Sequence, residues 1–128
     1  MDIRETNKGG NEQPVGGQGL ILLREASGQD LLEALILQVN KDFRLSGIDH
    51  EIPSGETPEQ VVAQLRLILK DLIREDFRGF LNLLYRADIS ESEIGRGESR
   101  DLDDFVDEAV YRLLKREWQK VWLRNRIR

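Results

Sequence analysis

Apolar residues recur at intervals of three and four positions along most of this chain. The clearest stripe runs through residues 58–75, and its members are Val61, Val62, Leu65, Ile68, Leu69, Leu72 and Ile73. This spacing places the apolar side chains on one face of an α-helix. No segment alternates apolar and polar residues for long enough to indicate a strand. The pattern therefore predicts an all-α fold, a compact bundle of about four helices with a long C-terminal helix.

Capping signals give the bounds of the first expected helix. Ser27 suits an N-cap, and Gln29 and Asp30 suit the first turn that follows it. From there apolar residues recur at helical spacing, and Gly47 is typical of a C-terminal stop. We therefore expect a helix over about 28–45, followed by a loop rich in glycine and proline.

Residues 57–60, with the sequence Thr-Pro-Glu-Gln, are a stronger helix start, because they combine a capping box with a proline at the first helical position. This start predicts a helix over 58–75. The apolar phase continues to residue 87, so periodicity alone permits one long helix. Asp76 as a cap and Gly79 in the next turn favour a break, and hence two helices.

The remainder of the chain predicts one short helical turn and one long helix. Ser90 and Glu93 form a second capping box, enough for a short turn, and a loop with the sequence Gly-Arg-Gly-Glu-Ser follows. The final helix begins near Asp101 and meets no stop signal before the chain ends.

The first residues differ in composition from the rest. Residues 7–19 hold five glycines, one proline and a single apolar residue, a composition that cannot repay the entropy lost on ordering. We expect a flexible N-terminal tail over 1–19 and a single helical domain over 20–128. A phosphate-binding glycine loop is the alternative, but the Lys-Ser/Thr pair that such a loop needs after its last glycine is missing.

Composition limits the classes of protein to which the chain can belong. A length of 128 residues, of which 39% are hydrophobic, suits one globular domain. The chain has no cysteine, which excludes disulfides and thiolate chemistry, and its net charge of −5 argues against a chain-wide affinity for nucleic acid. It shows no signal-peptide pattern and no apolar run of transmembrane length. We expect a soluble, cytoplasmic protein.

Few residues are arranged for catalysis or metal binding. The acidic segment 101–108 is the nearest approach to a metal site, but it lacks the turn glycine of a calcium loop, and acids also favour the first turns of a helix. His50, the only histidine, has no partner placed beside it and suits an exposed loop. We therefore expect a protein without catalytic, cofactor-binding or metal-binding residues.

The last helix has a wider apolar arc than one packing face requires. A core-facing stripe occupies its first half, and its members are Leu102, Val106, Ala109, Val110, Leu113 and Leu114. Beyond Leu114 this face becomes charged, while aromatic residues continue along a flank. The helix is also longer than the others, so its end can overhang the bundle. We predict a partner-binding surface made of Tyr111, Lys115, Trp118, Val121, Trp122 and Arg126.

A row of charges runs along the same helix at four-residue spacing, acids first and bases last: Asp104, Glu108, Arg112, Arg116, Lys120 and Arg124. Two antiparallel copies would set acid against base, so a homodimer is physically reasonable. The basic face itself is expected to be solvated, because pairing and the helix dipole explain its position without a ligand.

Three hypotheses of function follow from these features. The first is a non-enzymatic protein-interaction module that self-associates through the last helix, with the tryptophans as anchors. The second makes the basic, Trp-containing end of the chain a binding arm for RNA, DNA or anionic lipid. The third is a small carboxylate-dependent enzyme that uses the acidic segment. The sequence favours the first.

Overall fold

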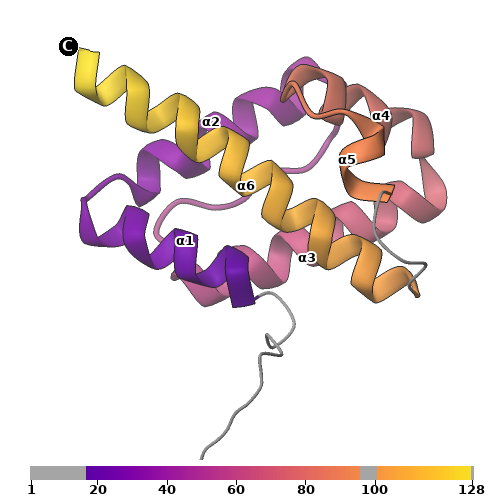
Figure 1. Cartoon of the computed structure of the whole chain (residues 1–128), viewed down its shortest axis with the longest axis horizontal. Coiled ribbons are helices and arrows are strands. Elements are labelled where there is room, and N and C mark those ends of the chain that lie inside the picture. Colours follow the sequence, from indigo (N-terminus) through magenta and orange to yellow (C-terminus); the bar gives the residue numbers. More distant parts are fainter. Residues whose placement is uncertain (1–16, 96–100, 128) are drawn as a thin grey trace, which may run out of the picture.

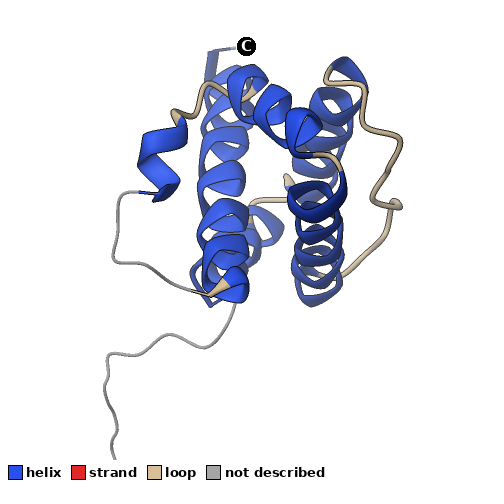
Figure 2. Cartoon of the chain, turned by 90° about the vertical axis from the view of Figure 1, so that its right-hand side faces the viewer, coloured by secondary structure: helices blue, strands red, loops and turns tan. Residues whose placement is uncertain are grey.

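The computed structural model describes residues 17–95 and 101–127. The described residues form six helices and no strand, which confirms the all-α class and the long C-terminal helix (Figure 2). The helices are α1 (Gly17–Gly28), α2 (Leu32–Leu45), α3 (Pro58–Glu75), α4 (Phe77–Arg86), α5 (Glu91–Gly95) and α6 (Leu102–Ile127).

The helix that the sequence did not predict is α1. Residues 17–19, assigned above to the tail, form its first turn, and Ser27 lies inside the helix instead of capping the next one. Tertiary packing explains the difference, because Leu23 is fully buried and Gly19 lies against α6, where a Cβ would come 3.3 Å from a methyl carbon of Leu114. Gly19 thus permits a close helix contact. The predicted tail residues 1–16 lie outside the described residues.

Three helices end in the same hydrogen-bonded turn. After α2, Gly47 has φ +78°, its N–H donates to Arg44 O, and Ile48 N–H donates to Phe43 O over 2.9 Å. This is the Schellman arrangement, and it confirms the predicted stop at Gly47. The same two bonds close α1 and α4, where aspartates with positive φ, Asp30 and Asp88, replace the glycine.

The signals for α3 and α4 are confirmed. Thr57 Oγ1 accepts a hydrogen bond from the Gln60 N–H, and Gln60 Oε1 accepts one from the Thr57 N–H, which completes the capping box. Residues 58–87 form two helices, because Asp76 Oδ1 accepts a 3.0 Å hydrogen bond from the Gly79 N–H and starts α4. A Cβ at Gly79 would collide with the same carboxylate. The predicted loop at 95–99 falls largely outside the described residues.

A single buried polar side chain holds the long loop between α2 and α3 on the bundle. Asn40 of α2 is buried, and its amide donates to Ile52 O over 2.9 Å and accepts from Ile52 N–H over 2.8 Å. Glu33, also on α2, accepts further bonds from Ser54 and Gly55. Two side chains of α2 therefore hold the loop, and Gln64 of α3 adds a hydrogen bond to Glu56 near its end.

The long helix α6 crosses the bundle diagonally and packs on α1, α2, α3 and α5 (Figure 1). The predicted core stripe of its first half is confirmed: Val106, Ala109, Val110, Leu113 and Leu114 are buried, and Leu102 is half-buried. Its C-terminal turns continue past the crossing with α2 toward the edge of the bundle. None of the helices in the described part of the chain has a stretch long and apolar enough to span a bilayer.

Candidate functional site

A shallow groove of about 460 Å³ runs between α1 and the second half of α6. Three of the predicted partner-binding residues, Tyr111, Lys115 and Trp118, line its α6 wall, and α1 forms the opposite wall. The full lining consists of Gln18, Ile21, Leu22, Glu25, Tyr111, Lys115, Trp118 and Gln119. The structure therefore brings half of the predicted surface together around one groove.

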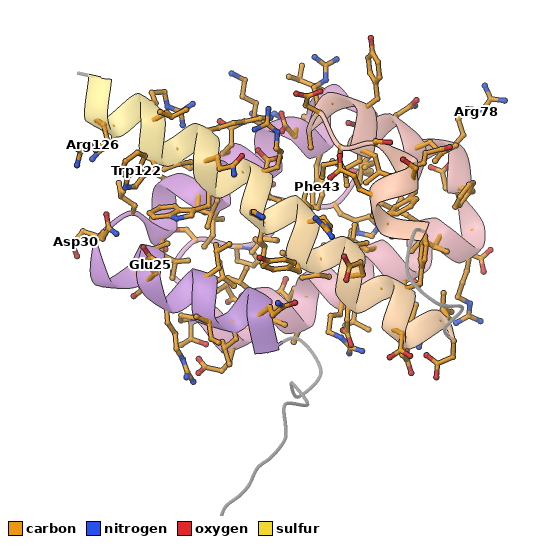
Figure 3. All side chains as sticks on the ribbon, in the orientation of Figure 1. Glu25, Asp30, Phe43, Arg78, Trp122 and Arg126 are labelled. Carbon is orange, nitrogen blue, oxygen red and sulfur yellow. The ribbon has the colours of Figure 1, made fainter. Side chains whose placement is uncertain are left out.

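Aromatic side chains and cations alternate along this face. The Nζ of Lys115 lies 5.9 Å from the centroid of the Tyr111 ring, and the Arg126 guanidinium lies 4.9 Å from that of Trp122. Both are cation–π distances. Figure 3 shows Trp122 and Arg126 at the same end of the molecule as Glu25, and the groove itself is lined by the acid Glu25 and the cation Lys115.

Large apolar side chains stay exposed on α1 and near the end of α6. Ile21 of α1 is 61% exposed, and Trp122 and Leu123 near the end of α6 are 37% and 53% exposed. Ile21 is a residue that the sequence analysis missed, because the helix that presents it was not predicted. An exposed apolar side chain is common when isolated, but Ile21 lines a groove together with Leu22, Tyr111 and Trp118.

One predicted partner-binding residue lies elsewhere. Val121 is 2% exposed and belongs to the core. Its place follows from helical spacing, since it lies seven positions after Leu114 and four after Glu117, on the inward face of α6. The core stripe therefore continues to Val121 and includes Glu117, although the sequence analysis expected this face to become charged beyond Leu114.

The basic row of α6 is largely engaged within the chain. Arg112 pairs with Glu108 over 2.7 Å, Arg116 with Asp88 over 2.9 Å, and Lys120 with Asp42 over 2.8 Å. Arg124 Nη1 donates to Gln38 Oε1 of α2 over 3.0 Å. These bases keep part of their exposure to solvent, but α2 and the turn after α4 also supply partners for them from the same chain.

A buried cluster of charges lies where α2 meets α6. Glu117 is 0% exposed, Asp42 is 3% exposed, and Lys120 Nζ lies 2.8 Å from Asp42 Oδ2 and 3.3 Å from Glu117 Oε1. Among the described residues, neither carboxyl oxygen of Glu117 has a partner with hydrogen-bond geometry. Gln38 Nε2 lies 3.4 Å from Asp42 Oδ1 and links the cluster to Arg124.

The pKa values of the two acids in this cluster are shifted in opposite directions. Burial raises the pKa of Glu117 to about 9, the Asp42 carboxylate adds to the rise, and Lys120 opposes it. Burial also acts to raise the pKa of Asp42, but contacts with Glu117, Lys120 and Gln38 outweigh it and hold that pKa below its usual value. At neutral pH the pair therefore shares one proton, held by Glu117.

The acidic segment at the start of α6 is used for capping and for ion pairs. Asp101 Oδ1 caps the helix by accepting from the Asp104 N–H over 2.9 Å. Asp103 pairs with Lys70 over 3.0 Å and Asp107 with Arg66 over 2.6 Å, so two acids bind α6 to α3. Within 17–95 and 101–127, no three potential ligands are grouped as a metal ion requires. His50 is exposed in the loop after α2.

The comparisons with known proteins add no relative: no family model, curated protein or solved structure matches this chain.

Proposed function

We propose that this chain is a non-enzymatic interaction module that associates with a second copy of itself through the face formed by α1 and the second half of α6. One observation carries the proposal: the exposed Ile21 and the half-buried Trp118 line the groove from opposite walls, and the exposed Trp122 follows Trp118 by about one turn of α6. Large aromatic residues that lose water in such grooves supply a disproportionate share of binding energy.

The charges of the groove favour a second copy as the occupant. Glu25 stands on the α1 wall and Lys115 on the α6 wall. A twofold axis along the groove would bring the α1 wall of each copy against the α6 wall of the other. Each copy then supplies both the acid and the base that its partner lacks on that side, so the surface is complementary to itself.

The contacts that the basic row of α6 makes within the chain weaken the phosphate-binding alternative. A binding arm for RNA, DNA or anionic lipid needs cations that are free to neutralise phosphates. Arg112, Arg116, Lys120 and Arg124 instead contact groups of their own chain, as described above. Lys115 and Arg126 lie over aromatic rings, where they also suit a protein interface.

The proposal is tested by sedimentation velocity over a wide range of protein concentration. We expect the wild-type chain to pass from monomer to dimer as concentration rises. Ile21→Lys should shift the transition to at least tenfold higher concentration, because it places a charge in the apolar contact. Leu67→Lys is the matched control, since Leu67 of α3 is 66% exposed and does not line the groove; its transition should match the wild type. Equal effects of the two variants, or a wild-type monomer at every concentration, would refute the proposal.

A charge exchange tests the occupant itself. Glu25→Lys and Lys115→Glu should each weaken the dimer, because each sets like charges against one another across the interface. The double variant restores opposite charges and should recover most of the lost affinity. Failure of this rescue, with all three variants folded by circular dichroism, would point to a different partner.

A further inference from the structure

The contact between α2 and the second half of α6 contains a carboxyl group whose charge the surroundings do not compensate. Glu117 is fully buried, and neither of its oxygens meets hydrogen-bond geometry with a described residue. Lys120 is the nearest cation, but it lies closer to Asp42, at 2.8 Å, than to Glu117, at 3.3 Å. One cation thus serves two buried acids.

The net charge of this cluster depends on whether Glu117 is protonated. With Glu117 protonated, the cluster holds one negative charge on Asp42 and one positive charge on Lys120, so it is neutral. With Glu117 ionised, it carries a net negative charge out of contact with water, which a protein interior strongly disfavours. The packed arrangement of α2 on α6 therefore suits only the protonated state.

We propose that Asp42, Glu117 and Lys120 form a protonation-dependent contact between α2 and α6. This contact holds the C-terminal turns of α6 on α2 while Glu117 is protonated, and it opens when Glu117 loses its proton. The raised pKa of Glu117 agrees with the geometry, since it shows that the folded state holds this proton. Release lets the carboxylate reach water.

Several charged groups on the other elements that pack on α6 have partners of their own, and on α5 Glu93 accepts a hydrogen bond from the Ser90 N–H. On α3, Arg66 and Lys70 pair with Asp107 and Asp103 near the start of α6. Asp88, in the turn after α4, binds Arg116, and Glu25 of α1 lines the groove on another face. Asp42 and Lys120 are therefore the charged groups that face Glu117. Arg124 lies farther away and donates a hydrogen bond to Gln38.

The end of α6 is suited to local release because few contacts hold it. Val121 is buried, but the residues described after it, 122–126, are all exposed. The Arg124 bond to Gln38 is part of the same cluster. Segments with few buried contacts open at low free-energy cost while the rest of a fold stays intact. Opening would also move Trp118, which lines the groove. It would therefore weaken the dimer, a consequence that rests on the proposed function.

The test follows acrylamide quenching of tryptophan emission in the full chain between about pH 6 and pH 9.5, where carboxyl groups of ordinary pKa stay ionised. Both tryptophans of the protein, Trp118 and Trp122, lie on the segment in question. The protein is kept dilute enough to be monomeric by sedimentation, so the result does not depend on self-association. For the wild type we expect the quenching constant to rise about twofold with pH while helix content stays near its starting value.

Two variants decide the interpretation. Glu117→Gln keeps the shape of the side chain without the charge, and its quenching should stay at the low-pH value throughout; Glu117→Met serves if the first variant does not fold. Glu108→Gln is the matched control, since Glu108 lies on the same helix, partly exposed and paired with Arg112, and should follow the wild type. An equal rise in Glu117→Gln, a flat wild-type curve, or loss of helix throughout the wild-type chain would overturn the proposal.

Discussion

The buried carboxyl of Glu117 makes the stability of the whole fold depend on pH in an unusual direction. In the unfolded chain this group loses its proton near its ordinary pKa of 4.5, whereas burial raises its pKa in the folded state to about 9. Between these values unfolding releases a proton, so rising pH favours unfolding. The contribution is fully present below about pH 4.5 and is lost as pH rises toward 9.

The size of the effect follows from linkage. One proton released on unfolding lowers the free energy of unfolding by about 1.4 kcal/mol per pH unit, or about 3 kcal/mol between about pH 5.5 and 7.5. Domains of this size are stable by only about 5–15 kcal/mol, so the loss is easily measured. Asp42 contributes with the opposite sign, because its lowered pKa makes stability fall as pH drops below the usual aspartate range.

Glu117→Gln removes the titrating group and should flatten this dependence. We expect urea unfolding, followed by circular dichroism at several pH values within this window, to show a slope near the linkage limit for the wild type and a much smaller one for the variant. Every other titrating group is present in both proteins, so the difference between the two slopes isolates Glu117. Parallel pH profiles would refute the argument that the folded state holds a proton on this residue.

Two further predictions concern the loops. Asn40→Ala should lower the free energy of unfolding by about 2–3 kcal/mol, because it leaves the N–H and the carbonyl of Ile52 unpaired in the interior. Urea unfolding measures this loss, and a change below about 0.5 kcal/mol would contradict the prediction. Asp30→Gly should raise the stability by about 1 kcal/mol, since Asp30 has φ +59°, where a side chain is strained, and Gly47→Ala at φ +78° should lower it by a similar amount. Thermal unfolding checks this pair, and shifts of the same sign would refute the strain argument.

Local signals in the sequence were sufficient to predict several elements. The capping box at Thr57, the second cap at Asp76 and the stop at Gly47 are each made by neighbouring residues, so α3, the α3–α4 break and the end of α2 follow from short stretches alone. The inward stripe in the first half of α6 follows from helical spacing in the same way. Tyr111, Lys115 and Trp118 share the groove because this spacing also places them on one flank.

The remainder depended on contacts between distant parts of the chain. The helix α1 has weak local signals and glycines in its first turn, and it packs on α6 through Leu23 and the close approach at Gly19, so the groove that it completes was hidden from the sequence. Glu117 resembles a surface charge when only its neighbours are considered. Its burial was decided by α2, because Asp42 and Lys120 form an ion pair that closes over it only once the two helices pack together. Sequence determines which faces a helix can present, but the environment of each face is set by the helix that arrives there.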